Sequence, residues 1–413
     1  YNNRAYPQNL SLLKHLAEKR FELANLLGYE NWADYVTADK MIGSAAKASD
    51  FISRIVEASG ERAAREYREL LERKRKDAPD AAAVNRWESA YYTEIVSKEN
   101  YSFDSQSVRP FFPYERVKQG VLDVMSGLFG VSFRQIENAP VWHEAVECWE
   151  MFENGELVGR FYLDMHPREG KYNHAAQFGI YTGVAGRRVP EAALVCNFPG
   201  GRADGEPGLL EYDEVSTFFH EFGHLLHTLF AGRGRWAGLG GIRTEWDFVE
   251  APSQLLEEWT KDAATLQTFA RHYQTDEPIP TELVTRMNRA GEFGKGLRVR
   301  QQMSYARLSL SIYDRAPETL DTDDLVKSIS AEYSPFPVVE NTHMQASFGH
   351  LDGYSAIYYT YMWSLVLAKD MFSVFDKNNL LAPDDAAARY RKAVLERGGA
   401  KPAECLVEAF LGR

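Results

Sequence analysis

The sequence feature that most restricts the fold of this chain is the pentapeptide His220-Glu221-Phe222-Gly223-His224. Residues four positions apart on a helix lie one above the other, with about 5–6 Å between their Cβ atoms. Two imidazoles at this spacing can bind one metal ion from the same helix face, and the glutamate beside them can reach a metal-bound water without being a ligand. We therefore predict a helix with His220 and His224 as zinc ligands and Glu221 as a general base.

The residues around the pentapeptide predict a buried helix. Apolar side chains recur at near-helical spacing, and Gly232 and Gly234 end the pattern, so the helix is expected to run from about residue 212 to residue 231. Two core histidines without a metal are the alternative interpretation. The glutamate between them would then be a buried charge without a function, and burying an unpaired charge is unfavourable. The metal site is therefore the preferred interpretation.

A zinc ion that keeps one position open for chemistry needs a third protein ligand. Glu250 is the best candidate, because it follows His224 by 26 residues and precedes Pro252, which the first turn of a second helix tolerates. The competing carboxylates are Glu245, Glu257 and Glu258. A solvated helix face is the preferred interpretation of the last two, although Glu257 could instead orient a ligating histidine.

His227 lies on the same predicted helix, one turn beyond the ligands. It is expected to hydrogen-bond to nearby backbone or to a carboxylate rather than to bind the metal. None of the three cysteines is placed as a metal ligand.

Several further motifs occur in order along the chain. They are Phe161-Tyr-Leu-Asp-Met-His-Pro-Arg-Glu-Gly-Lys-Tyr172, Phe218-Phe-His-Glu-Phe-Gly-His-Leu-Leu-His227, Asp247-Phe-Val-Glu-Ala-Pro-Ser-Gln254 and Ser347-Phe-Gly-His-Leu-Asp-Gly-Tyr354. Through these motifs the chain resembles the M3 metallopeptidases, the group of thimet oligopeptidase, neurolysin, oligopeptidase A and peptidyl-dipeptidase. The resemblance implies a mainly α fold with a small mixed β-sheet, in which a zincin-like catalytic core belongs to a two-lobed helical oligopeptidase architecture.

The resemblance also implies roles for individual residues. The zinc ligands would be His220, His224 and Glu250, with one Zn²⁺ per chain, and the general base would be Glu221. The residues implied to bind substrate and to stabilise the tetrahedral intermediate are His350, Tyr354 and Tyr361. Spacing alone leaves catalysis and core packing equally open for the tyrosines, and the resemblance favours packing for Tyr358 and Tyr359.

The implied activity is that of a zinc-dependent endo-oligopeptidase acting on short unstructured peptides. Three alternatives remain open: a peptidyl-dipeptidase that releases C-terminal dipeptides, a fragment that retains zinc and binds peptides without turnover, and a purely structural zinc helix. Two features depart from the family pattern. Asp352-Gly353 replaces a pair of glycines before Tyr354, and the loop Gly240-Gly-Ile-Arg-Thr244 holds one extra residue.

Composition restricts the classes of partner. The net charge of −12 argues against nucleic acid and anionic membranes, and no apolar run approaches the roughly 20 residues of a membrane helix. Short peptides are the expected partners, a cytoplasmic location is the default expectation, and the oligomeric state is left open. Because the first residue is Tyr1, we expect the chain to be the catalytic-side part of a longer protein.

Hydrophobic periodicity predicts how the chain is organised. Helices are expected at 9–27, at 45–76 with a break at Gly60, and at 113–128, followed by a hairpin whose turn is Glu153-Asn-Gly-Glu156. Residues 192–197 are expected to form a strand, and we hypothesise that substrate docks against it. The predicted divisions are 1–95, part of a helical lobe; 96–290, a catalytic lobe; 291–345, the return of the helical lobe; and 346–413, a tyrosine-bearing part of the catalytic lobe.

Overall fold

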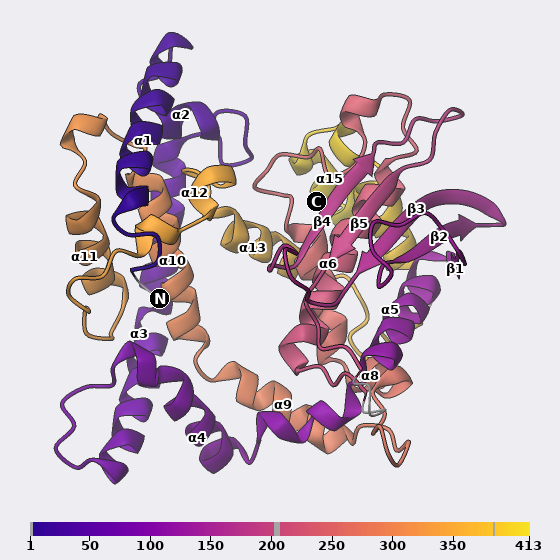
Figure 1. Ribbon diagram of the computed structural model, residues 1–413, viewed down its shortest axis with the longest axis horizontal. Helices are drawn as coiled ribbons and strands as arrows, with labels where there is room; N and C mark the ends of the chain where they lie inside the picture. The colour runs from indigo at the N-terminus through magenta and orange to yellow at the C-terminus, as the bar shows by residue number, and fades with distance from the viewer. Residues whose placement is uncertain (1–2, 202–206, 383–384) are drawn as a thin grey trace. The chain divides into compact units, whose positions relative to one another are not determined.

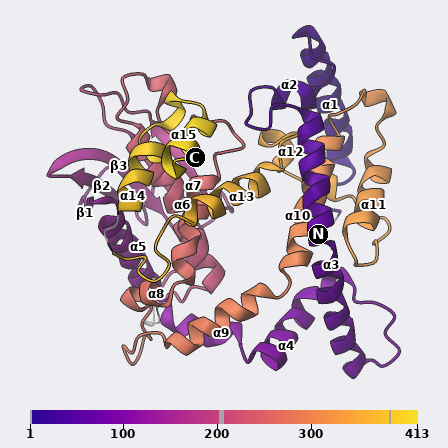
Figure 2. The ribbon, with the colours of Figure 1, turned by 180° about the vertical axis from the view of Figure 1, so that it is seen from behind.

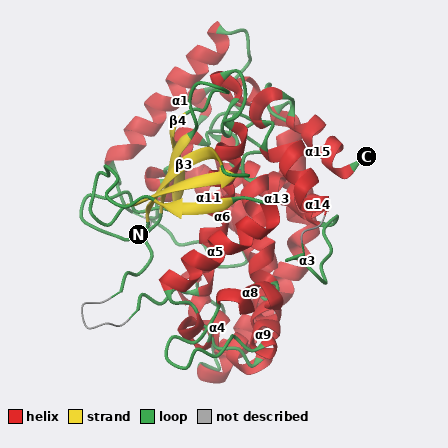
Figure 3. Ribbon diagram, turned by 90° about the vertical axis from the view of Figure 1, so that its right-hand side faces the viewer, coloured by secondary structure: helices red, strands yellow, loops and turns green. Residues whose placement is uncertain are grey.

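The computed structural model describes residues 3–201, 207–382 and 385–413. It divides into two compact units: a first unit of Tyr1–Ser102 with Arg289–Trp363, and a second unit of Phe103–Asn288 with Ser364–Arg413. Helices predominate, and the strands form one small mixed sheet (Figures 1 and 3). The predicted mainly α fold with a small mixed sheet is confirmed. No helix within the described ranges has both the length and the apolar character needed to cross a bilayer.

The first unit is helical. Its helices are α1 (Gln8–Leu26), α2 (Trp32–Thr37), α3 (Ala45–Asp77), α4 (Ser89–Tyr101), α10 (Lys295–Ser311), α11 (Thr322–Tyr333) and α12 (His350–Gly353). Two helices cross the boundaries between the units in sequence, α9 (Thr281–Glu292) and α13 (Thr360–Phe372). The buried side chains of Leu70, Val96 and Phe336 belong to its core.

The predicted break of the long helix at Gly60 is wrong, because α3 continues without interruption from Ala45 to Asp77. One glycine in a helix interior costs only about 1 kcal/mol relative to alanine. Burial of Ile52, Ala63 and Leu70 along one face of α3 offsets that cost. The other predicted helices near the N-terminus, α1 and α5, begin and end within one residue of the expected positions.

The second unit combines a sheet with helices. The helices are α5 (Tyr114–Phe129), α6 (Tyr212–Ala231), α7 (Ala251–Leu256), α8 (Ala263–Phe269), α14 (Asp385–Tyr390) and α15 (Ala403–Leu411). The strands are β1 (Ser132–Gln135), β2 (Glu147–Glu153), β3 (Glu156–Asp164), β4 (Ala176–Tyr181) and β5 (Glu191–Val195). Their order in the sheet is β1-β2-β3-β5-β4, and only the β3–β5 pair is parallel.

The predicted hairpin is confirmed, since Asn154 and Gly155 join β2 to β3 with positive φ values of 50° and 83°. The hypothesis that substrate docks against residues 192–197 is wrong. β5 is paired on both sides, to β3 and to β4, so its backbone groups are already used within the sheet. Among the described strands, β4 ends the sheet on this side and therefore presents the free edge.

The units do not coincide with all of the predicted divisions. Boundaries fall at 102/103 and 288/289, close to the predicted 95/96 and 290/291, whereas residues 346–363 are grouped with the first unit. Long-range hydrogen bonds explain this grouping: Arg20 binds the Leu351 carbonyl, and Ser309 binds the Tyr354 carbonyl. The assignment of these segments to functional lobes stays a prediction.

Candidate metal centre and aromatic segment

Helix α6 carries the pentapeptide across the buried face of the sheet. It begins with a capping box in which Glu211 and Glu214 satisfy each other's backbone N–H groups. The ring of Phe222 packs edge-to-face on Phe161 of β3, with 5.9 Å between centroids. From Phe218 to Ala231 every residue of the helix except His220 is buried, so the His220 ring lies at the least covered position of this part of the helix.

Helix α7 lies beside α6 and brings the third side chain of the group (Figure 2). Glu250 is the residue directly before α7, and Pro252 occupies the first turn, as predicted. The two helices approach closely at Gly223, where an added Cβ would lie 2.7 Å from the Cα of Ser253. A glycine between the two histidines is therefore what lets Glu250 reach them.

The structure brings His220, His224 and Glu250 together, with one potential ligand atom of each within 4.8 Å of the others. Glu250 Oε2 lies 3.2 Å from His220 Nε2 and 3.1 Å from His224 Nε2. Burial would raise the pKa of Glu250, but the two histidines outweigh burial and hold that pKa well below its ordinary value. These three are the only residues of the described chain that form such a group of histidine, cysteine or acidic side chains.

Glu221 lies beside this group but is not part of it. Its side chain is buried, and its Oε2 has no hydrogen-bond partner among the described residues. Burial is the main cause of a raised pKa for Glu221, and the charges of His224 and His220 act in the opposite direction. A buried carboxylate with an unpaired oxygen and a raised pKa is suited to accept a proton from a water molecule.

The preferred interpretation of Glu257, a solvated helix face, is wrong, and the structure supports the alternative in which Glu257 orients a ligating histidine. Its Oε1 lies 2.8 Å from His220 Nδ1, so the bond orients the imidazole and leaves Nε2 directed at Glu250. Burial would lower the pKa of His220, but the hydrogen bonds to Glu250 and Glu257 raise it to about 10. The seven-residue spacing from Glu250 to Glu257 was the available signal.

The other competing carboxylates have structural partners. Glu258 is not on a solvated face, because its side chain is only 10% exposed and pairs with Lys261 and Lys369 at 2.5 Å each. Glu245 accepts hydrogen bonds from the backbone N–H of Ala403 at 2.9 and 3.1 Å. Neither carboxylate is available to the histidines.

His227 differs from the expectation. It is completely buried, and neither ring nitrogen has a hydrogen-bond partner within the ranges that the structure describes. Burial, with a smaller contribution from His224, lowers the pKa of His227 to about 3. The expected bond to backbone or carboxylate is therefore absent, and the imidazole is a neutral core side chain.

The remaining predicted site residues lie in the first unit, in an aromatic segment that we define as residues 348–361. The rings of Tyr354 and Tyr361 stack with 5.1 Å between centroids, and His350 contacts both at 5.7 and 5.9 Å. Tyr358 packs among Phe348, His350 and Tyr361, and its hydroxyl donates to Gln302 Oε1 at 3.0 Å. The structure thus brings His350, Tyr354 and Tyr361 together.

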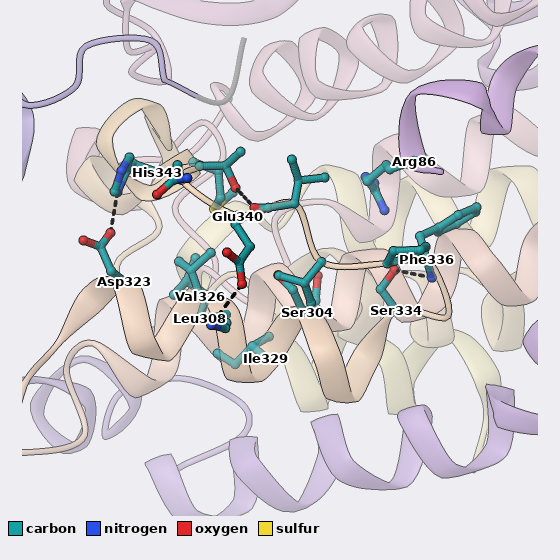
Figure 4. A pocket seen from close by; sticks show the side chains of 18 of the residues that line it. Arg86, Ser304, Leu308, Asp323, Val326, Ile329, Ser334, Phe336, Glu340 and His343 are labelled. Atoms are coloured by element: carbon teal, nitrogen blue, oxygen red, sulfur yellow. Dashed lines mark hydrogen bonds and ion pairs between the residues drawn. The ribbon is translucent and has the colours of Figure 1, made fainter. Parts of the chain in front are cut away.

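The first unit also holds a cavity of about 370 Å³ between α10, α11 and the segment 334–344 (Figure 4). Figure 4 shows His343 and Asp323, whose side chains are 2.6 Å apart, at one end and Phe336 near Arg86 at the other. None of the predicted site residues lines this cavity.

Comparison with known proteins places the chain in a family. The family described as Peptidase family M3 matches residues 1–413. The thimet-like oligopeptidase of Dictyostelium discoideum is 32% identical over 98% of this chain and 63% of its own length. The dipeptidyl carboxypeptidase of Escherichia coli is 33% identical over 98% of this chain and 60% of its own length.

A solved structure is similar in fold. PZ peptidase A with an inhibitor has a TM-score of 0.58 at 12% identity, covering 97% of this chain and 61% of that one. The chain therefore spans about three-fifths of the length of the curated relatives that it matches.

Proposed function

The chain belongs to peptidase family M3, and from this premise we propose that the protein is a zinc-dependent endo-oligopeptidase that hydrolyses internal bonds of short, unstructured peptides. The observation that carries the proposal is the group of half-buried His220 with buried His224 and Glu250, and the buried carboxylate of Glu221 beside it. A cytoplasmic location stays a prediction.

The three side chains fit a zinc ion. Bonds of 2.0–2.2 Å at tetrahedral angles separate neighbouring ligand atoms by about 3.3–3.6 Å. The distances from Glu250 Oε2 to the two Nε2 atoms, 3.2 and 3.1 Å, are close to the lower end of that range. Zinc bound by these residues would polarise a carbonyl group and lower the pKa of a bound water to about 7. Because the group contains three ligands and no fourth among the residues that the structure describes, it fits a catalytic rather than a structural zinc.

The protein's own residues would move the proton. Glu221 Oε2, which is buried and has no hydrogen-bond partner in the described part of the chain, would accept the proton of the attacking water and later donate it to the leaving amine. Glu257 would hold His220 in the tautomer that keeps Nε2 free for the metal. His350, Tyr354 and Tyr361 would supply hydrogen-bond donors to the substrate carbonyl as negative charge develops on it.

The edge of β4 supports binding of an extended peptide. A peptide that adds to a sheet edge is held by main-chain hydrogen bonds, so its sequence matters little. Gln177 of β4 links this strand to the site, because its backbone hydrogen-bonds Glu221 and its side chain lies 3.2 Å from Thr228 of α6. This placement would carry a peptide past the general base.

A peptidyl-dipeptidase is the second candidate, favoured by the similarity to the dipeptidyl carboxypeptidase. A set of peptides with free and amidated C-termini separates the two activities. Dipeptide release requires a free carboxylate, whereas cleavage of internal bonds continues when the C-terminus is amidated.

The proposal is tested by hydrolysis of a quenched nine- or ten-residue peptide, with and without a zinc chelator, using Glu221→Gln as control. We expect hydrolysis that chelation abolishes, and a kcat that Glu221→Gln lowers by about 10²–10⁴-fold with one zinc still bound. Hydrolysis unaffected by either treatment would refute it. Zinc and peptide binding without any product would instead identify a peptide-binding fragment.

A further inference from the structure

Arg20 of α1 contacts the backbone of the aromatic segment. Its Nη1 donates to the Leu351 carbonyl at 2.6 Å, and its Nη2 donates to the Asp352 carbonyl at 2.8 Å. Both carbonyls belong to α12, a helix of one turn, and the last carbonyls of a helix have no partner within the helix. One guanidinium therefore satisfies two backbone groups next to His350.

Arg20 is itself held from the other side. Its Nη1 also donates to the hydroxyl of Tyr313 at 2.7 Å, and Tyr313 is buried just after the end of α10. The guanidinium lies over the rings of Tyr313 and Trp32, at 5.2 and 5.3 Å from their centroids. A planar group with several donors suits this arrangement, and a lysine ammonium could not span it.

The anchored stretch contains two exposed glycines. A Cβ added at Gly349, directly before α12, or at Gly353, its last residue, would meet no atom within 4 Å, so both glycines lie in open space. Further along, Ser309 Oγ donates to the Tyr354 carbonyl at 2.9 Å and Trp32 Nε1 donates to Ser355 Oγ at 3.0 Å. Arg20, Ser309 and Trp32 thus form a set of side-chain anchors along residues 351–355.

We propose that Arg20 is a positioning residue that holds the backbone of residues 349–355, so that His350 and Tyr354 keep a single arrangement of their side chains. The proposal rests on the proposed function, in which these two side chains contact the substrate. Arg20 acts only through the segment.

Hydrogen–deuterium exchange of the 413-residue chain tests the anchoring directly. Arg20→Met removes the donors and retains the aliphatic stem, and exchange in residues 349–355 is expected to become about tenfold faster, because bonds to a charged donor are lost. Arg300→Met is the matched control. Arg300 also binds carbonyls of the first unit, those of Val56, Glu332 and Tyr333, and its loss should leave residues 349–355 unchanged.

Kinetics test the consequence. We expect Arg20→Met to lower kcat about tenfold and to change KM by less than about twofold, the result for an interaction expressed in the transition state. Arg20→Lys should recover part of the loss, since it restores one donor. Tyr313→Phe, which removes a partner of Arg20 and leaves the carbonyl bonds, serves as a milder variant if Arg20→Met does not fold.

Two results would overturn the proposal: unchanged exchange in residues 349–355 in the Arg20 variants, or the same acceleration in Arg300→Met. Equal losses of thermal stability and activity in both arginine variants would show an ordinary structural role. If the unsubstituted chain hydrolyses no peptide, the proposed function fails for this chain, and the exchange comparison still decides the role of Arg20.

Discussion

The metal-ligand group and the aromatic segment are built in different ways. His220 and His224 lie on one helix and Glu250 directly before the next, so ordinary helix geometry with one close contact at Gly223 brings them together. The aromatic segment contains only short helical turns, and its anchor Arg20 is 331 residues away from Leu351 in the sequence. The metal-ligand group is formed by neighbouring helices and is mostly buried. The aromatic segment depends on long-range contacts and contains exposed glycines. We therefore expect the two to respond independently to mutation.

The largest expected effect breaks the metal group and leaves the segment intact. Glu250→Ala removes one of three ligands and leaves the two histidines without their shared partner. We expect zinc affinity to fall by more than about 100-fold, since loss of a partner outside the ligand set already costs 10–100-fold. Zinc titration against a competing chelator measures it.

The control for that substitution is Glu245→Ala, which removes a nearby carboxylate bonded to the Ala403 backbone. It should bind zinc normally. Equal loss of zinc in both variants would mean that the second unit had lost its structure, and unchanged affinity in Glu250→Ala would remove Glu250 from the ligand set.

The next effect breaks the segment and leaves the metal group intact. Removing the hydroxyl in Tyr354→Phe should lower kcat by about 10²–10³-fold, the cost of losing one donor to a developing oxyanion. Tyr358→Phe is the matched control, because its hydroxyl is bonded to Gln302, and it should change kcat by less than about threefold. Zinc binding should be normal in both. A Tyr354→Phe variant as active as Tyr358→Phe would show that Tyr354 only packs.

A smaller effect sharpens the description of the metal group. Glu257→Ala removes the acceptor on His220 Nδ1 and should weaken zinc binding by about 10–100-fold. Glu258→Ala, at the adjacent position, breaks ion pairs with Lys261 and Lys369 instead and should lower stability without changing zinc affinity. The reverse pattern would return Glu257 to the solvated face that its sequence context suggested.

The comparison also explains what the sequence could predict. The apolar spacing around His220 and His224, ended by Gly232, predicted their helix and its limits, because helical periodicity is a local property of the sequence. The docking edge was misplaced, since an apolar run such as residues 191–195 predicts a buried strand but carries no information about which neighbours pair with it. The solvated face was preferred for Glu257 and Glu258 because charged residues on helices are usually solvated, although orientation of a histidine by Glu257 was the stated alternative. Arg20 was not singled out. The bonds of Glu257 and Arg20 and one ion pair of Glu258 join residues far apart in sequence, which local patterns do not reveal.

The smallest expected effect concerns the helix of the metal group. Burial, and secondarily His224, hold the pKa of His227 at about 3, below the value near 6.5 expected in the unfolded chain. Because the pKa is lowered in the folded state, the protonation of His227 costs no stability above pH 6.5. As the pH falls below 6.5, His227 gains a proton in the unfolded chain but not in the folded chain. The native protein should therefore lose stability through His227 between pH 6.5 and 3.

His227→Leu removes this linkage while keeping an apolar side chain in the core. The difference in unfolding free energy between variant and parent should shift by about 1.3 kcal/mol in favour of the variant when the pH falls from 7.0 to 5.5. Denaturant unfolding of the two proteins in chelator measures it. The raised pKa of His220 acts on both proteins alike and in the opposite direction, with stability lost as the pH rises toward 10, so the difference isolates His227. If the difference in unfolding free energy stays constant with pH, the buried imidazole has a proton or a polar partner in solution. The end of α6 around His227 would then be more polar than its packing indicates.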